Sequence, residues 1–443
     1  MKRTILAAAV AAAVLATTAP AATAATTICE TTVTIPGAPA PGPAFTQQLR
    51  VLKVGPESAA KVLVLIAGRG EAANGFRDVA KDLVARTPGL QVWAVDRREQ
   101  NLADLAAFRA GPDAAAEYYL SGSYRHQDAK TAPYAANWGL DLELRDVRQA
   151  VLAARDHGRR QVILGGHSLG ATAVLDYAAW DFDGTPGYRD LSGLMLLDGG
   201  VRNALAGAGI DFSITEQGAR DWKAQIEAGA VFDNATSLYN NFGDGPENAA
   251  IDYQLAASYA ATAPHAPSPI QDRLPAAVRP TRQLTNAGLL GWLVDEHAAL
   301  PGYAVTSGHL DAAGDWVDEG ITPISRVARE MSGTNPAAWE WYSPNRLALD
   351  YFGTATFADD AVAQYLGLRI KHVSEINVPL YVFQSSLTNG TVGDAAVAVA
   401  KDTKIPRVSV NTDNSMTHLD ILFAAPEHNS FVQTAVPFLK TLR

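Results

Sequence analysis

Five residues near the middle of the chain have the composition and spacing of a catalytic turn. Gly166-His167-Ser168-Leu169-Gly170 directly follows the apolar segment Gln161–Leu164 and directly precedes a helical pattern at Ala171–Trp180. A serine in a tight strand-to-helix turn has its hydroxyl group held clear of the backbone, where it can attack a carbonyl carbon. The flanking glycines are needed because a side chain at either position would clash as the turn closes. The pattern predicts that Ser168 is a nucleophile.

A serine hydroxyl needs a base, and histidine is the usual one. If the chain order is serine, acid, histidine, the base must follow the last strand, and only His418 and His428 of the nine histidines lie after Arg407. His418 lies in a loop that places an imidazole over the carboxyl edge of a sheet, so it is the predicted base. His428 lies in or next to the last helix and is the weaker alternative. The other histidines, His167 included, are interpreted as structural or solvent-facing.

An acid must orient the imidazole and stabilise it when it is charged. The segment Leu191–Leu197 ends in Asp198, followed by two glycines, which puts a carboxylate at the tip of a buried strand. The segment Val378–Phe383 is followed by no acid until Asp394. Placement at a strand end favours Asp198, and Asp394 is the alternative.

The negative oxygen that forms during attack on a carbonyl needs two N–H donors. The backbone N–H of Leu169, directly after the nucleophile, is predicted to be one of them. The other is expected from the turn Gly68-Arg69-Gly70 after the apolar segment Lys61–Ala67. Arg69 is the predicted residue and Gly70 the alternative. No metal site and no cofactor are predicted, because no metal-binding spacing or glycine-rich phosphate loop is found.

Apolar β-branched segments alternate with helical patterns, which predicts an α/β fold with a mostly parallel central sheet flanked by helices. The predicted strands are Thr31–Ile35, Leu49–Val54, Lys61–Ala67, Leu90–Val95, Gln161–Leu164, Leu191–Leu197, Val378–Phe383 and Arg407–Asn411. The predicted helices are Asn74–Arg86, Leu140–His157, Ala171–Trp180 and a last one from Glu427 to about Leu442.

The regular alternation stops between residues 201 and 376. This segment is predicted to be a large cap or lid inserted into a sheet domain formed by residues 25–200 and 377–443. A second, smaller insertion covers about residues 111–138. Aromatic residues of the large insertion are candidates for lining an apolar pocket, although for any single one a place in the core of the insertion is the better interpretation. They are Trp222, Trp292, Trp316, Trp339, Trp341 and Tyr342.

The N-terminus has the pattern of a secretory signal peptide. Lys2 and Arg3 precede an apolar run, Ile5–Ala16, and Ala22-Thr23-Ala24 is a small-x-small cleavage site. The apolar run is too short for a comfortable membrane span, so residues 1–24 are expected to be removed and the mature protein secreted without a membrane anchor. The full chain has 36 Lys and Arg against 46 Asp and Glu, a balance that disfavours nucleic acid as a partner.

These motifs resemble the α/β-hydrolase superfamily. The matching residues are GHSLG at 166–170, AGRG at 67–70, VDRRE at 95–99, LLDGG at 196–200 and THLD at 417–420. GHSLG is similar to the turn of lipases and esterases, and the whole chain resembles secreted actinobacterial members. The resemblance implies the α/β-hydrolase fold and a serine-histidine-acid triad. One departure concerns the acid: many members carry it after the second-last strand, where this chain offers only Asn389 and Asp394.

The sequence therefore predicts a secreted serine hydrolase that cleaves carboxylic esters, with a small-molecule or lipophilic ester as substrate. A peptidase or amidase of the same fold is the first alternative, and acyl transfer to an acceptor other than water is the second. A non-catalytic binding protein on the same scaffold is the contrasting class. It would require one member of the triad to be absent.

Overall fold

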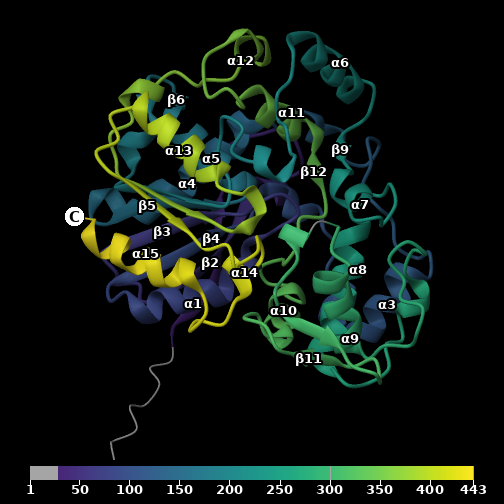
Figure 1. Cartoon of the computed structure of the whole chain (residues 1–443). Coiled ribbons are helices and arrows are strands. Elements are labelled where there is room, and N and C mark those ends of the chain that lie inside the picture. The colour runs from purple at the N-terminus through teal and green to yellow at the C-terminus, as the bar shows by residue number, and fades with distance from the viewer. Residues whose placement is uncertain (1–27, 300, 443) are drawn as a thin grey trace, which may run out of the picture.

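The computed structural model describes residues 28–299 and 301–442 (Figure 1). The predicted signal peptide, residues 1–24, lies outside the described residues. None of the described helices combines the length and the apolar character that a membrane crossing requires.

The core is an eight-stranded sheet with the strand order β1-β2-β4-β3-β5-β8-β13-β14. β2 pairs antiparallel with both β1 and β4, and the remaining neighbours pair in parallel. The predicted mostly parallel sheet is confirmed, and each predicted strand is present. The strands are β1 (Glu30–Pro36), β2 (Gln48–Val54), β3 (Lys61–Ile66), β4 (Leu90–Val95), β5 (Gln161–His167), β8 (Gly193–Leu197), β13 (Leu380–Gln384) and β14 (Val408–Thr412).

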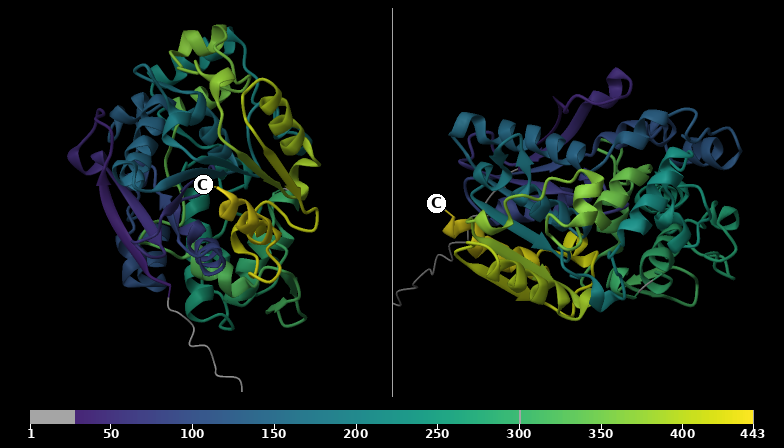
Figure 2. Two further views of the ribbon diagram at one scale, coloured as in Figure 1. Left: turned by 90° about the vertical axis from the view of Figure 1, so that its left-hand side faces the viewer. Right: turned by 90° about the horizontal axis from the view of Figure 1, so that it is seen from above.

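Helices cover both faces of this sheet (Figures 1 and 2). Alternate residues of β3 enter different cores: Leu63 and Leu65 pack on one face, Val62 and Val64 on the other. This explains the unbroken apolar pattern of the strand, since a strand buried on both faces has no polar side. The first face is covered by α1 (Arg77–Arg86) and α15 (Ser430–Thr441), the second by α4 (Leu140–Arg155), α5 (Leu169–Ala179) and α13 (Thr391–Lys401).

Residues 201–376 form a mainly helical layer beside the sheet (Figure 1). Its helices are α6 (Glu216–Glu227), α7 (Ala235–Tyr239), α8 (Asn248–Thr262), α9 (Asn286–Gly291), α10 (Ile324–Met331), α11 (Asn345–Gly353) and α12 (Ala361–Leu366). The shorter insertion contributes α3 (Pro112–Leu120), which follows α2 (Ala106–Ala110), and the short α14 (Asp420–Phe423) precedes α15. The described residues also form three two-stranded pairs: β6 (Asp181–Phe182) with β7 (Thr185–Pro186), β9 (Phe232–Asp233) with β12 (Ser343–Pro344), and β10 (Gly308–Leu310) with β11 (Trp316–Asp318).

The two insertions pack against each other. The hydroxyl of Tyr259 on α8 donates a hydrogen bond to Asp113 on α3, at 2.7 Å. Tyr124 of the shorter insertion is hydrogen-bonded to Tyr342 of the longer one and stacks edge-on against Trp341. Tyr124, Trp341 and Tyr342 therefore belong to one aromatic cluster that both insertions share.

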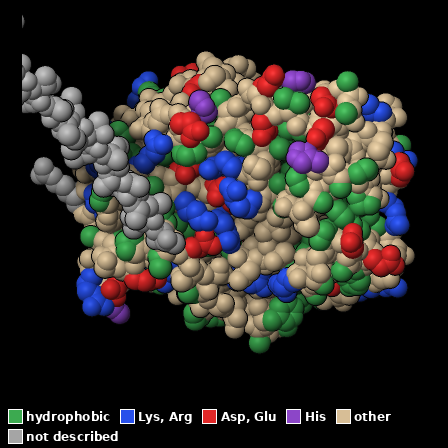
Figure 3. Space-filling view, turned by 90° about the horizontal axis from the view of Figure 1, so that it is seen from below, with side chains coloured by type: hydrophobic (Ala, Val, Ile, Leu, Met, Phe, Trp, Pro, Cys, Tyr) green, Lys and Arg blue, Asp and Glu red, His purple; other side chains and the backbone are tan. Residues whose placement is uncertain are grey.

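Ion pairs join the large insertion to the sheet domain. Arg326 on α10 contacts Asp82 on α1 at 2.9 Å, and Arg329 is paired with Asp78. Figure 3 shows basic side chains gathered near the middle of one face of the molecule, with acidic side chains among them. Because the ion pairs of Arg326 and Arg329 join α10 to α1, this part of the insertion is fixed to the domain that carries the sheet.

Candidate active site

The turn at Ser168 connects β5 to α5 in a conformation that few non-glycine residues adopt. Ser168 has φ 55° and ψ −123°, and its backbone N–H donates a hydrogen bond to the carbonyl oxygen of Leu197 at 2.8 Å. Such backbone strain persists only where the surrounding structure enforces it, and it is concentrated at functional sites. The helix begins at Leu169 rather than at the predicted Ala171, because the turn consists of Ser168 alone.

The glycines on both sides of Ser168 have no room for a side chain. A Cβ atom on Gly166 would lie 2.2 Å from the carbonyl oxygen of Gly170, and a Cβ on Gly170 would lie 2.3 Å from that of Ile66. Both contacts are with backbone atoms, so rotation of a side chain could not relieve them. The predicted steric reason for these glycines is confirmed.

We expect Gly166→Ala to lower the free energy of unfolding by about 3 kcal/mol, because the added methyl group forces apart the backbone of the turn. Urea denaturation followed by circular dichroism measures the loss. Gly75→Ala is the matched control, since the nearest atom to its Cβ, on Leu422, lies 4.0 Å away. Equal stability of the two variants would show that the turn tolerates the methyl group.

His418 and Asp198 are brought together at the carboxyl ends of the strands. His418 Nδ1 lies 2.7 Å from Asp198 Oδ2, and both side chains are buried. Burial alone would raise the pKa of Asp198, but hydrogen bonds from His418 and Ser385 hold that pKa below its ordinary value. Burial lowers the pKa of His418, and the neighbouring His167 lowers it further. The lowered pKa values of Asp198 and His418 both favour a charged carboxylate beside a neutral imidazole.

The other ring nitrogen of His418, Nε2, has no hydrogen-bond partner among the described residues. Ser168 and His418 line the same cavity. The alternatives lie elsewhere: Asp394 is exposed on α13, and His428 is exposed before the start of α15. The structure thus brings together Ser168, His418 and Asp198, but neither alternative residue.

The turn after β3 has two of its three N–H groups already engaged. The N–H of Gly68 donates to Glu71 Oε2, and the N–H of Gly70 donates to Glu340 Oε2, each at 2.9 Å. Within residues 28–299 and 301–442, the N–H of Arg69 has no acceptor. The geometry therefore favours Arg69 over Gly70 as the donor to an oxyanion.

The N–H of Leu169, at the start of α5, is likewise without an acceptor in the described part of the chain. It is one of the N–H groups that the first turn of a helix leaves unsatisfied. Arg69 also has a side-chain contact, because its guanidinium is paired with Asp233 of the large insertion. Leu169 and Arg69 both line the cavity that contains Ser168.

Arg97 holds the turn after β3 in place through hydrogen bonds to its backbone. Its guanidinium donates to the carbonyl oxygens of Ala67 at 2.6 Å and Gly68 at 3.1 Å. The same group is paired with Glu143 at 2.7 Å and with Glu340 at 3.2 Å. Sequence reasoning did not identify Arg97 or Glu340, and no local pattern marks either, since their partners are distant in the chain.

The large insertion supplies part of this framework. Trp339 forms an isolated antiparallel bridge with Glu71, and the N–H of Glu340 donates to the carbonyl oxygen of Gly70 at 3.1 Å. This part of the insertion is therefore hydrogen-bonded to the turn that presents Arg69.

The insertion also holds the loop that carries His418. The N–H of His418 donates to the carbonyl oxygen of Gly302 at 2.8 Å. The buried carboxylate of Asp420 accepts hydrogen bonds from the N–H and hydroxyl of Thr306 and from the hydroxyl of Thr322. Burial of this carboxylate is compensated by these hydrogen bonds, so Asp420 fixes the His418 loop to the insertion.

Ser168 and His418 open into a cavity of about 360 Å³. Its apolar lining comes mostly from the insertion and includes Leu205, Ile210, Phe212, Tyr239, Tyr253, Leu293, Val294, Tyr303, Met331, Trp339 and Phe352. Of the aromatic residues singled out in the sequence, Trp339 lines this cavity. Trp316, Trp341 and Tyr342 are buried in the core instead.

Glu71, His167 and His418 are the one group of described residues whose potential metal-binding atoms all lie within 4.8 Å of one another. The ring nitrogens of His167 already lie at hydrogen-bond distance from acceptors, with Nδ1 2.8 Å from Glu71 and Nε2 3.0 Å from the carbonyl oxygen of His418. We therefore interpret the group as a hydrogen-bonded network.

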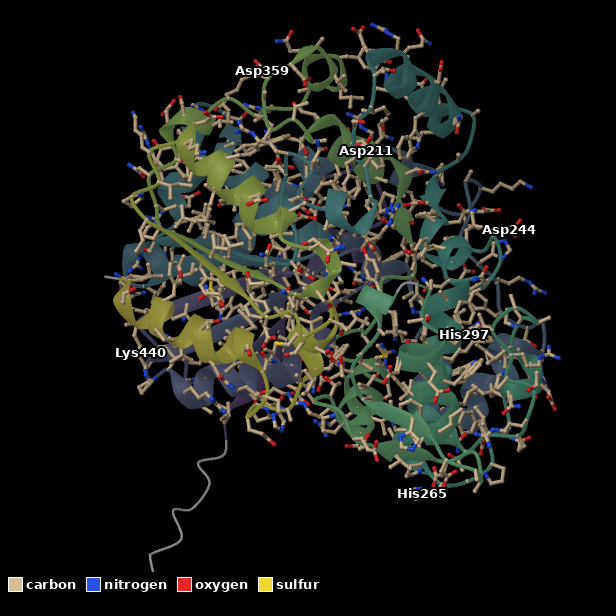
Figure 4. All side chains as sticks on the ribbon, in the orientation of Figure 1. Asp211, Asp244, His265, His297, Asp359 and Lys440 are labelled. Atoms are coloured by element: carbon tan, nitrogen blue, oxygen red, sulfur yellow. The ribbon has the colours of Figure 1, made fainter. Side chains whose placement is uncertain are left out.

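Other histidines of the insertion have separate partners. His265 contacts Asp315 at 2.7 Å, and His297 Nε2 lies 3.0 Å from the carbonyl oxygen of Ala277. Figure 4 shows His265 at the outer edge of the insertion, well apart from His297. Neither His265 nor His297 lines the cavity that contains Ser168.

No protein-family model matches the chain, and no curated protein matches its sequence. Solved structures do match. A lipase candidate from Sulfolobus solfataricus is 17% identical, with 94% of this chain and 95% of that chain covered and a TM-score of 0.51. An epoxide hydrolase from an endophytic Streptomyces is 14% identical over 94% and 96% of the two chains, with a TM-score of 0.43. A monoglyceride lipase from Saccharomyces cerevisiae is 12% identical over 89% and 90%, with a TM-score of 0.41. The sheet order, the strand-to-helix turn at Ser168 and the first of these similarities together show that the chain has the α/β-hydrolase fold.

Proposed function

We propose that this protein is a serine hydrolase that cleaves carboxylic esters. The observation that carries the proposal is the buried pair of His418 and Asp198, 2.7 Å apart, in the same cavity as the strained turn of Ser168. A neutral imidazole held by a carboxylate on one nitrogen, with the other nitrogen free, is the arrangement that a general base requires.

In the proposed reaction, the Ser168 hydroxyl attacks the ester carbonyl while His418 Nε2 takes its proton. The N–H groups of Leu169 and Arg69 bind the negative oxygen that forms. His418, now charged and stabilised by Asp198, gives the proton to the departing alcohol, which leaves an acyl-enzyme. A water molecule then attacks the acyl group, with His418 again accepting a proton, and releases the acid.

The cavity favours a lipophilic ester. It is of ordinary size for a small-molecule site, and its walls are mainly aliphatic and aromatic. Burial of apolar groups in such walls supplies binding free energy in proportion to the area removed from water. An amidase and an acyltransferase would use the same residues, so they are separated from the esterase by substrate alone.

We expect kcat/KM for p-nitrophenyl esters to rise about fourfold with each added methylene until the cavity is filled, because each buried methylene contributes about 0.8 kcal/mol. Hydrolysis of the series from acetate to palmitate measures this. The p-nitroanilide of the best acyl group is the matched amide, and we expect it to react far more slowly. Faster release of nitroaniline than of nitrophenol would show that the protein is an amidase rather than an esterase. Failure of the folded protein to react with any ester or with a fluorophosphonate would favour a binding protein.

Secretion is also proposed, with cleavage near Ala24, on the pattern of charged, apolar and small residues at the N-terminus.

A further inference from the structure

His167 lies at the centre of the site although it is not a member of the proposed triad. Its side chain is completely buried, and its ring lies 4.2 Å from the ring of His418, centroid to centroid. Nδ1 is 2.8 Å from one carboxylate oxygen of Glu71 and 3.0 Å from the other. Nε2 is 3.0 Å from the backbone carbonyl oxygen of His418.

Both nitrogens of His167 therefore face acceptors. A carbonyl oxygen can only accept a hydrogen bond, and an ionised carboxylate likewise only accepts. His167 satisfies both when each nitrogen carries a proton, which makes the ring a cation. Burial by itself would lower the pKa of His167, but the charge of Glu71 and the hydrogen bond to it raise that pKa. For Glu71, burial is the strongest single influence and acts to raise the pKa, but the charge of His167 and the hydrogen bonds from His167 and Gly68 together outweigh it, so that this pKa is lowered.

Glu71 extends the connection to the turn that carries Arg69. Its side chain is 16% exposed, and one oxygen accepts the N–H of Gly68 at 2.9 Å. A continuous chain of hydrogen bonds thus runs from the turn, through Glu71 and His167, to the backbone of His418. It joins the two loops whose relative position decides whether an oxyanion and a base can act on one substrate.

We propose that His167 and Glu71 are positioning residues of this active site, which hold the His418 loop and the Arg69 turn together and place a positive charge beside His418. The inference rests on the proposed function. The charge keeps His418 neutral, and therefore able to accept the proton of Ser168, down to a lower pH than an isolated histidine would allow.

The charged and titratable groups around His418 set the direction of this effect. Burial lowers the pKa of His418 most, and the positive charge of His167 comes next. Asp198 and Glu71 act in the opposite direction, Glu71 less than His167. Tyr303 contacts the ring edge-on with centroids 4.8 Å apart, and burial raises the pKa of its hydroxyl, so it stays neutral.

The test measures the rate of covalent labelling by a fluorophosphonate as a function of pH. This probe reacts with an activated Ser168 whichever acyl group the enzyme prefers. In His167→Gln the positive charge is gone, the pKa of His418 rises, and the midpoint of the acid limb moves to higher pH by about one unit. The labelling rate on the plateau falls about tenfold, because the carbonyl oxygen of His418 loses its charged donor.

His167→Gln leaves the carboxylate of Glu71 without its charged partner, which destabilises the folded state. A second variant therefore removes both charges. The double variant Glu71→Gln, His167→Gln replaces both charges with amides that can still hydrogen-bond. Because Glu71 opposes His167 but acts less strongly, the acid limb of this variant should also move upward, by less than in the single variant. His265→Gln, at a 77% exposed side chain far from the site, is the control and should leave the profile unchanged.

The labelling results distinguish failure of the proposed role of His167 from failure of the proposed serine hydrolase function. Labelling of the wild-type protein with an unchanged acid limb in both folded variants, or a shift to lower pH, would overturn the role of His167 and leave the serine hydrolase intact. A wild-type protein that does not label at all would overturn both.

Discussion

Replacement of Ser168 by alanine is expected to lower kcat for ester hydrolysis by about 10⁴-fold or more, because the reaction loses the atom that forms the acyl-enzyme. The variant should also lose covalent labelling by a fluorophosphonate entirely. Residual hydrolysis above the rate in water would reflect binding and the N–H groups of Leu169 and Arg69, which the substitution leaves in place.

The matched control is Ser121→Ala, at an exposed serine of the shorter insertion whose hydroxyl is hydrogen-bonded only to Ser123 among the described residues. It should keep wild-type activity. Both variants should unfold at the wild-type temperature, since neither removed hydroxyl is needed by the fold. If Ser168→Ala keeps more than about a tenth of the activity, another nucleophile performs the reaction and the proposal is wrong.

The strands and the residues at their ends could be predicted from the sequence for a physical reason. A strand buried on both faces, such as β3, is a short apolar run, and its length and the glycines that follow it distinguish it from a buried helix. Parallel strands end at a common edge, so residues directly after different runs are brought together. This is why the sequence predicts that Asp198 and His418, 220 positions apart, act together.

The network around these residues could not be predicted, because it depends on contacts between distant segments. The hydrogen bond from Gly70 to Glu340 joins residues 270 positions apart, and Glu340 lies in a segment with no regular pattern. From the sequence, His167 is expected to be structural or solvent-facing. It is completely buried beside His418, because β5 continues through His167, the residue directly before Ser168. The role of its ring nitrogens follows only from the position of Glu71.

The identity of the acid is the point on which this chain departs from the pattern of many α/β-hydrolases, and Asp198→Asn tests it. We expect kcat to fall about 10³- to 10⁴-fold. An asparagine amide facing His418 Nδ1 would donate a hydrogen bond there, which leaves the proton on Nε2. His418 could then no longer accept the proton of Ser168, although the oxygen of the new side chain could still accept the N–H of Ser385.

Asp394→Asn is the matched control, because it makes the same chemical change at the alternative acid. Asp394 is exposed on α13, and its replacement should change kcat by less than twofold. Asp198 is held in place by Ser385, the residue directly after β13: the N–H of Ser385 donates to Asp198 Oδ1 at 2.9 Å. The end of β13 thus orients an acid that comes from the end of β8. A large loss in Asp394→Asn with full activity in Asp198→Asn would reverse the assignment, and would require α13 to move toward His418.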